Sequence, residues 1–330
     1  EAYVDSWVGD RAVDYIREHG RTAESDSGDE RPFFMFVGFP NPHIPFDAPE
    51  PYASMYDPAD MPIPPTFYES LAGKPPQHLG YKRYGRKVNY ENLTEEKLRR
   101  CIAYYYGATT LVDDQVGKII RSLEETKLLD ETVVVFVSDH GELLGHFGML
   151  IKSIDAYPML YDVGLKVPCV IRTPEHSEAD ISKTGDQPGL TNTAGTVISD
   201  PVELIDLCPT ILESAGLEVA PEIQGMSLVD AMTGGSAPER KFIFAETGAV
   251  KTIRGERFKL VYYPGQEYGE LYDVKNDPNE IVNLYDDPEL SGTREAMIRD
   301  LLDRLIYTEG ARHGESLRGP AYWRTMYSIP

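Results

Sequence analysis

Residues Val133–Lys152 read VVVFVSDHGELLGHFGMLIK, and this stretch decides the fold predicted for the chain. Residues 133–137 are apolar and mostly β-branched, and polar residues flank them on both sides. That pattern is typical of a strand buried on both faces, as in a parallel sheet covered by helices. Asp139, His140 and Gly141 follow the strand, and open α/β sheets bind ligands beyond such strand ends. The tripeptide by itself also fits an N-capping Asp followed by a turn, so the surrounding chain must decide.

Composition narrows the class of protein. The chain has 330 residues, enough for one large or two modest domains with a sizeable core. No apolar run approaches the roughly 20 residues that span a bilayer, so we expect no membrane span. The formal charge of −22 argues against binding to nucleic acid or to anionic membranes. An anionic substrate would therefore need a local positive site.

The three cysteines and the start of the chain indicate the state of the thiols and the origin of the polypeptide. Cys101, Cys169 and Cys208 lie in apolar settings and show no zinc or redox spacing, which favours buried free thiols over disulfides. The chain opens on Glu1 and enters a helix at once, so we interpret it as a fragment or a processed product. Localisation, whether cytoplasmic, periplasmic or secreted, stays open, since a signal peptide would have preceded this segment.

Further patterns predict the order of elements in residues 1–235, the expected core domain. Phe33 to Val37 form a second apolar run that predicts a strand buried on both faces, and the proline-rich loop after it carries His43. Residues 49–92 show no clear periodicity and predict a long excursion. The other predicted elements are a helix from Asp5 or Ser6 to about His19, a long helix over 94–126, a strand over 167–172, a polar stretch over 175–196, and a helix from Pro201 to Ala215.

Residues 236–330 have a different texture and predict a smaller subdomain. Short strands joined by glycine-containing turns, over 241–245, 249–254, 258–263 and 270–273, predict an antiparallel sheet. A last helix is predicted over 293–307. The aromatic tail, 322–327, is a candidate surface for docking on the core or for homo-oligomer formation.

The candidate site residues are Asp139, His140, Lys152 and His43. A carboxylate oxygen and an imidazole suit a divalent metal, and Lys152 offers a cationic donor for a tetrahedral oxyanion. His43 follows a predicted strand end and could protonate a leaving oxygen, although a loop histidine is also a common surface residue. Metal and Lys152 together would make the local positive site that the acidic chain needs. The residues alone indicate metal-assisted transfer on an anionic ester.

At this point the chain resembles the sulfatase family of the alkaline-phosphatase-like superfamily, and the resemblance runs along nearly all of it. Its motifs, in order, are Pro42-His43-Ile44-Pro45 with Ala48-Pro49, Asp113-Asp114-Gln115-Val116-Gly117, Ser138-Asp139-His140-Gly141-Glu142 with Lys152, Pro201 to Leu207 with Pro209-Thr210, and Gly269-Glu270-Leu271-Tyr272-Asp273. The resemblance implies an α/β fold. Its architecture would be an alkaline-phosphatase-like sandwich, with a mostly parallel sheet between helices and a smaller C-terminal antiparallel subdomain.

The resemblance also implies roles. Asp139 and His140 would be metal ligands, Lys152 would contact the sulfate, and His43 would lie beside the scissile ester and help the leaving group. The metal would be calcium, with manganese or zinc as alternatives because His140 stands where many sulfatases carry Asn. The substrate would be a sulfated small molecule or glycan. Asp113, Asp114, Asp162 and Lys166 are interpreted as structural, and His146 is given no role.

Departures from the family pattern limit this reading. The family nucleophile is a formylglycine made in a Cys/Ser-x-Pro-x-Arg motif that normally precedes the segments matched here. No Cys of this sequence stands in such a motif, and the Ser match, Ser236-Ala237-Pro238-Glu239-Arg240, comes after the Pro201 to Leu207 segment instead of before all of them. The family's paired aspartates, and the Lys and His flanking the nucleophile, also have no counterpart. We therefore expect the carboxy-terminal two-thirds of a sulfatase, inactive alone. The alternatives are a phosphonate monoester or phosphodiester hydrolase of the same superfamily, and a non-catalytic relative that binds sulfated ligands.

Overall fold

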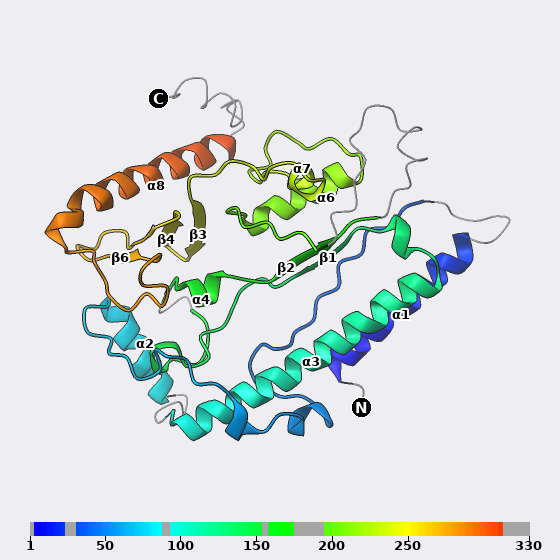
Figure 1. Cartoon of the computed structure of the whole chain (residues 1–330), viewed down its shortest axis with the longest axis horizontal. Coiled ribbons are helices and arrows are strands. Elements are labelled where there is room, and N and C mark those ends of the chain that lie inside the picture. Colours follow the sequence, from blue (N-terminus) through cyan, green and yellow to red (C-terminus); the bar gives the residue numbers. More distant parts are fainter. Residues whose placement is uncertain (1–2, 24–30, 88–92, 154–157, 175–194, 313–330) are drawn as a thin grey trace.

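Two long helices that pack side by side form one layer of the molecule. The structure, a computed structural model, describes residues 3–23, 31–87, 93–153, 158–174 and 195–312. Helix α1 (Val4–Ala23) packs along α3 (Glu95–Glu125), as Figure 1 shows. Thr94 caps α3 by accepting a hydrogen bond from Lys97 N, as its position before two glutamates predicts. Gly9 allows the two helices to approach closely, since a Cβ at this position would lie only 2.7 Å from Gln115 Oε1.

The second layer is a small sheet in the middle of the molecule (Figure 1). Strand β1 (Val134–Val137) pairs antiparallel with β2 (Cys169–Arg172), with Val134 opposite Arg172 and Val137 opposite Cys169. Both strands are where the sequence predicts them, but this pair is not parallel. A parallel return needs a crossover of about a dozen residues or more, usually a helix. The described chain between these strands holds only the short helices η4 (His146–Gly148) and α4 (Asp162–Leu165).

The burial predicted for the two apolar runs is wrong. Phe136 in β1 is 41% exposed, and its partner Val170 in β2 is 62% exposed. Residues 33–37 form no strand in the structure, and Phe34 and Phe36 are 74% and 86% exposed. Phe33 packs on the other side, edge-on against the rings of α1. The β-branched and aromatic composition sets the extended backbone, whereas burial needs covering elements that the described residues do not supply.

The predicted C-terminal sheet is confirmed. Strands β3 (Ile243–Thr247), β4 (Val250–Arg254), β5 (Phe258–Tyr262) and β6 (Glu270–Asp273) form an antiparallel sheet in that order. Helix α8 (Ser291–Arg312) lies against it, and Leu301 packs with the fully buried Ile253, Leu260 and Leu271. Together with the helices around β1 and β2, this sheet gives the mixed α and β fold with a separate antiparallel subdomain that the sequence predicts.

The remaining elements connect these layers. They are η1 (Tyr52–Ser54), η2 (Pro58–Asp60), α2 (Pro76–Lys87), η3 (Leu129–Glu131), η5 (Leu204–Asp206), α6 (Leu207–Ser214), α7 (Val229–Met232) and η6 (Pro288–Leu290). Helix α2 lies in the excursion for which the sequence predicted no regular element. The helix expected from Pro201 begins at Leu204 instead, because Glu203 and Asp206 form a capping box there.

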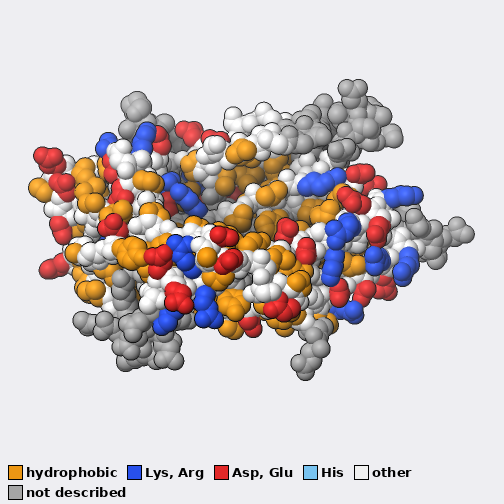
Figure 2. All heavy atoms as spheres, turned by 60° about the horizontal axis from the view of Figure 1, so that its bottom comes forward, with side chains coloured by type: hydrophobic (Ala, Val, Ile, Leu, Met, Phe, Trp, Pro, Cys, Tyr) orange, Lys and Arg blue, Asp and Glu red, His pale blue; other side chains and the backbone are white. Residues whose placement is uncertain are grey.

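Surface features complete the description. The three cysteines are free, as predicted, but Cys169 and Cys208 are exposed rather than buried. Within the described residues, no helix has the length and apolar character to cross a bilayer. Figure 2 shows hydrophobic side chains gathered across the middle of one face, with charged side chains of both signs around them. The tail over 322–327 and most of the 175–196 stretch lie outside the described residues.

Candidate functional site

The loop that follows β1 carries most of the predicted site. The Asp139 carboxylate accepts a hydrogen bond from the backbone N–H of His140, 2.9 Å away, and Ser138 Oγ donates to the His140 carbonyl. The loop then turns back through Gly145 and Gly148, whose φ angles of 103° and 66° favour glycine. This path returns the chain so that Lys152 lies beside His140.

His140 and Lys152 form the centre of the candidate site. Lys152 Nζ lies 2.5 Å from His140 Nε2, and His140 Nδ1 lies 2.8 Å from the Gly141 carbonyl oxygen. A carbonyl only accepts, so Nδ1 carries the proton and donates it. The Nε2 lone pair is then left facing Lys152. This is the tautomer that a metal-binding imidazole adopts when its second nitrogen donates to a backbone carbonyl.

Asp139 lies at the same place with more exposure to solvent. Its Oδ2 is 3.5 Å from His140 Nε2, and its side chain is 86% exposed against 34% for His140. An exposed carboxylate beside an imidazole lone pair fits a divalent cation by donor chemistry. Two protein donors are fewer than such ions use, and the described residues contain no group of three or more His, Cys, Asp or Glu side chains arranged for a metal. The residues present therefore fit one part of a metal site.

The backbone next to Lys152 is held by the buried Tyr81 of α2. Its hydroxyl donates to the Ile151 carbonyl oxygen at 2.8 Å and accepts from the Ile151 N–H at 3.2 Å. Glu142 lies in the same loop, and burial raises the pKa of its carboxyl to about 7 despite the nearby charge of Lys152. The loop thus has one fixed cation and one carboxyl that titrates near neutrality.

His43 is not brought into this group by any contact among the described residues. It is exposed, its Nδ1 lies 2.7 Å from the Ile44 carbonyl oxygen, and its N–H donates to the Pro40 carbonyl. The loop is anchored nearby, where Asn41 donates to the Asp5 carboxylate of α1 at 2.8 Å. The role of His43 beside the ester therefore stays a prediction.

Other histidines and aspartates have structural surroundings. His146 is buried, its Nδ1 lies 2.7 Å from Thr66 Oγ1, and burial lowers its pKa to about 4. Asp114 accepts from the Tyr52 hydroxyl at 2.6 Å, which ties α3 to the loop before it. These contacts agree with the structural interpretation of Asp114.

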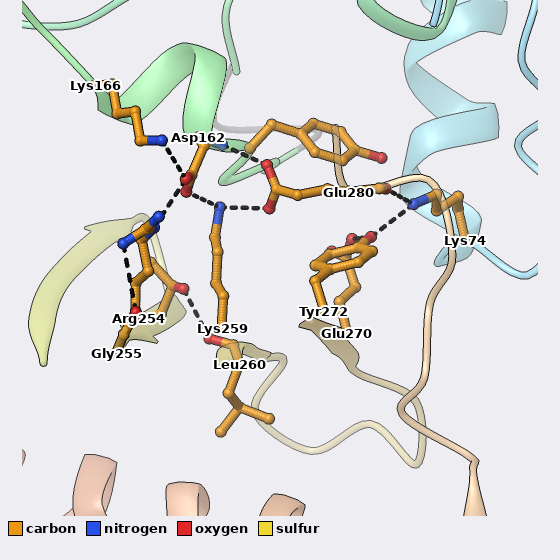
Figure 3. A network of polar contacts seen from close by, with 12 residues as sticks. Lys74, Asp162, Lys166, Arg254, Gly255, Lys259, Leu260, Glu270, Tyr272 and Glu280 are labelled. Atoms are coloured by element: carbon orange, nitrogen blue, oxygen red, sulfur yellow. Dashed lines mark hydrogen bonds and ion pairs between the residues drawn. The ribbon is translucent and has the colours of Figure 1, made fainter. Parts of the chain in front are cut away.

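A buried ionic network beside the loop was not predicted as a unit. Lys259 of β5 is fully buried, and its Nζ lies 2.9 Å from Asp162 Oδ1 and 2.6 Å from Glu280 Oε1 (Figure 3). Asp162 also accepts from Arg254 Nε at 2.8 Å. The carboxylate charge is balanced in this way, and the pKa of Asp162 lies well below its usual range because these cations outweigh its burial. One sequence signal was present, since Lys259 interrupts an apolar strand whose neighbours are Phe258 and Leu260.

Two family models match this chain. Residues 3–217 match the family model described as Sulfatase. Residues 155–306 match a second model, described as N-sulphoglucosamine sulphohydrolase, C-terminal. The two matches together cover nearly all of the described chain.

Individual relatives are similar over most of this chain. An arylsulfatase of Clostridium perfringens is 27% identical over 92% of this chain and 59% of its own length. A choline-sulfatase of Rhizobium meliloti is 29% identical over 80% of this chain and 48% of its own. The crystal structure of a phosphonate monoester hydrolase of Agrobacterium radiobacter superposes with a TM-score of 0.74 at 28% identity, covering 93% of this chain and 62% of that one. The chain thus spans about half to three fifths of the length of these relatives.

Proposed function

Because the chain belongs to the sulfatase family, we propose that it carries part of the active site of a sulfuric ester hydrolase. The observation that carries the proposal is the pairing of Lys152 Nζ with His140 Nε2 at the end of β1. In an acidic chain, this places a lysine ammonium directly beside the imidazole nitrogen that could ligate a metal. The substrate class we propose is a sulfate monoester of a small molecule or glycan.

In this proposal, Lys152 donates hydrogen bonds to the sulfate oxyanion. An ammonium group provides up to three N–H donors, and only one direction is used toward His140. The remaining donors can bind sulfate oxygens, and they stabilise the charge that these oxygens carry during transfer. The Tyr81 contacts to Ile151 fix the backbone from which Lys152 extends, so little ordering is needed on binding.

Asp139 and His140 would hold a divalent metal, which we propose to be calcium, with manganese and zinc as alternatives. A bound metal of this kind polarises an ester oxygen as a Lewis acid. The Nδ1–H of His140 donates to the Gly141 carbonyl, so Nε2 is the ring acceptor; it contacts Lys152 in this structure, and a bound metal would take its lone pair in place of that contact. Asp139 would supply an oxygen donor, and its single negative charge would balance half of the charge of a divalent ion. Further ligands must come from outside the described cluster.

His43 would protonate the leaving oxygen. Its imidazole is exposed on a loop that is fixed to α1 through Asn41, so it can face solvent or substrate without a cost of burial. General acids of this kind act within hydrogen-bond reach of the leaving atom. The Cys/Ser-x-Pro-x-Arg pattern occurs at Ser236–Arg240, where Arg240 pairs with Asp206 away from the candidate site, so no attack step is assigned to this chain.

A phosphonate monoester or phosphodiester hydrolase is the second candidate. The similarity to the Agrobacterium radiobacter phosphonate monoester hydrolase, at 28% identity, favours it. An imidazole ligand at His140 also suits zinc or manganese better than it suits calcium. A third candidate is a relative that binds sulfated ligands without turnover.

Isothermal titration of the polypeptide with sodium sulfate and with phenylphosphonate, each in the presence of Ca²⁺ or Mn²⁺, tests the proposal. Sulfate should bind, and Lys152→Ala should weaken it about 10- to 100-fold, as expected for a lost charged hydrogen bond. Lys275→Ala is the matched control, because its 61% exposed ammonium pairs with Glu256 and has no described contact with the loop after β1 or with α4, so sulfate affinity should stay unchanged. Phenylphosphonate binding that exceeds sulfate binding would favour the second candidate. Equal affinity of wild type and Lys152→Ala would refute the assigned site.

A further inference from the structure

Helix α4 lies between the candidate site and the C-terminal sheet. The Gly141 N–H donates to the Gly164 carbonyl of α4 at 2.9 Å, and a Cβ on Gly141 would lie only 2.2 Å from the Val163 carbonyl oxygen. The backbone at Gly141 is therefore in direct contact with α4. The same residue accepts the Nδ1–H of His140, so any displacement of α4 is passed to the imidazole.

The first residue of α4 is fixed from the C-terminal sheet at both its backbone and its side chain. The Asp162 N–H donates to Glu280 Oε2 at 2.6 Å, while its carboxylate contacts Lys259 and Arg254 (Figure 3). Lys259 joins both carboxylates and has no solvent exposure. Because these groups are buried, any movement that separates them leaves a charge unpaired, and that penalty makes the arrangement stiff.

The same network reaches the other support of the site. Lys74 donates to the Tyr272 hydroxyl at 2.9 Å and also to the Glu280 carbonyl, and its ammonium lies 4.7 Å from the ring centre of Phe147 in the returning loop. Lys74 directly precedes α2, which carries the Tyr81 that binds Ile151. Both ends of the loop, near His140 and near Lys152, are thus held by elements that contact Glu280, α4 through Asp162 and α2 through Lys74.

We propose that Asp162 and Lys259 are positioning residues for the candidate site: through α4 they fix Gly141, and through Gly141 they fix the direction of the His140 imidazole relative to Lys152. The proposal rests on the proposed function in so far as it concerns ligand affinity. The C-terminal sheet would then help to orient the site, although it contributes no candidate ligand. Outer contacts that orient a ligand of this kind change affinity about 10- to 100-fold when they are removed.

The test compares Asp162→Asn with Asp206→Asn. Asp162→Asn keeps the shape of the side chain and the backbone contact to Glu280 but removes the charge that Lys259 and Arg254 bind. Asp206→Asn is the matched control, since Asp206 is 1% exposed, binds Arg240 through two contacts of 2.8 Å, and has no described contact with α4 or with the loop. Both variants lose a buried ion pair, so both should lose stability.

Two readouts separate positioning from stability. The first is the ¹⁵N spectrum of the His140 side chain at one pH, assigned with His140→Gln, which reports which ring nitrogen carries the proton. Asp162→Asn should change the ¹⁵N shifts of this ring, and Asp206→Asn should leave them unchanged. The second is sulfate affinity in the presence of Ca²⁺, which should fall about 10-fold in Asp162→Asn and less than about 2-fold in Asp206→Asn.

The outcomes distinguish the two proposals. If the wild type binds no sulfate, the proposed function fails, while the imidazole spectrum still decides the positioning role. If Asp162→Asn leaves the spectrum unchanged, or if both variants alter it equally, the positioning role is overturned. If Asp162→Asn fails to fold, Lys259→Met combined with Glu280→Gln removes the ionic contacts of Lys259 without leaving a lone buried charge, since Asp162 keeps Arg254, and the same spectral change is then required.

Discussion

Replacing Lys259 by Met should strongly destabilise the protein, by an amount that depends on pH. Lys259 is fully buried and contacts two carboxylates, at 2.9 Å and 2.6 Å. Removing one partner of a buried ion pair typically costs about 3–5 kcal/mol, because the remaining charge stays unpaired. Asp162 keeps Arg254 and Lys166 as partners, so most of the loss falls on Glu280, whose carboxylate keeps, among the residues that the structure describes, only the Asp162 N–H.

The pH dependence follows from the Glu280 carboxyl. Burial already raises its pKa, and Lys259 opposes that rise. Without Lys259 the pKa rises further, so the folded variant binds a proton that the unfolded chain loses above about pH 4.5. The stability of the variant therefore falls as pH rises, and its deficit against wild type should be larger at about pH 8 than at about pH 5.

Urea unfolding followed by circular dichroism at both pH values measures this deficit, with the slope of the transition as a check that the same surface unfolds. Lys259→Met with Glu280→Gln should recover at least half of the loss, since no lone charge remains. A deficit below about 1 kcal/mol at pH 8, which is the size of an exposed ion pair, would refute the reasoning that this network is buried and dry.

Further predictions concern other parts of the chain. The polypeptide alone should hydrolyse 4-nitrophenyl sulfate no faster than buffer, and turnover well above buffer would show that this chain supplies a nucleophile after all. Wild-type stability should gain from the neutral state of His146 as pH rises from about 4 to 6.5, since the folded imidazole binds fewer protons there than the unfolded one. His146→Gln should flatten that part of the thermal midpoint profile, and an unchanged slope would contradict the assignment. Phe36→Ser, at a side chain that is 86% exposed, should alter the free energy of unfolding by less than about 0.5 kcal/mol and reduce binding of an apolar dye. Thr94→Ala should lower that free energy by about 1 kcal/mol in urea titration, because α3 loses its N-cap; no change would mean that water replaces the cap.

Much of the local structure follows from the sequence. The apolar spacing and the Thr94 cap predict α3 almost to the residue, and alternating strands with glycine turns predict the C-terminal sheet. These features depend on contacts between residues near each other in the chain, so local patterns suffice. The same holds for the loop after β1, where Asp139 and His140 follow the strand directly and glycines allow the return to Lys152.

Tertiary structure alone decided the rest. Whether an apolar run such as 33–37 is buried depends on which elements cover it, and composition does not specify those elements. The antiparallel pairing of β1 with β2 depends on how residues 138–168 return. The network around Lys259 joins residues from four separate segments, and a charged residue in a strand does not indicate its partners. What the sequence determined about this protein is the local order of strand, loop and candidate side chains at the end of β1; what only the fold decided is which distant side chains contact that loop, because long-range contacts are set by packing and charge balance in three dimensions.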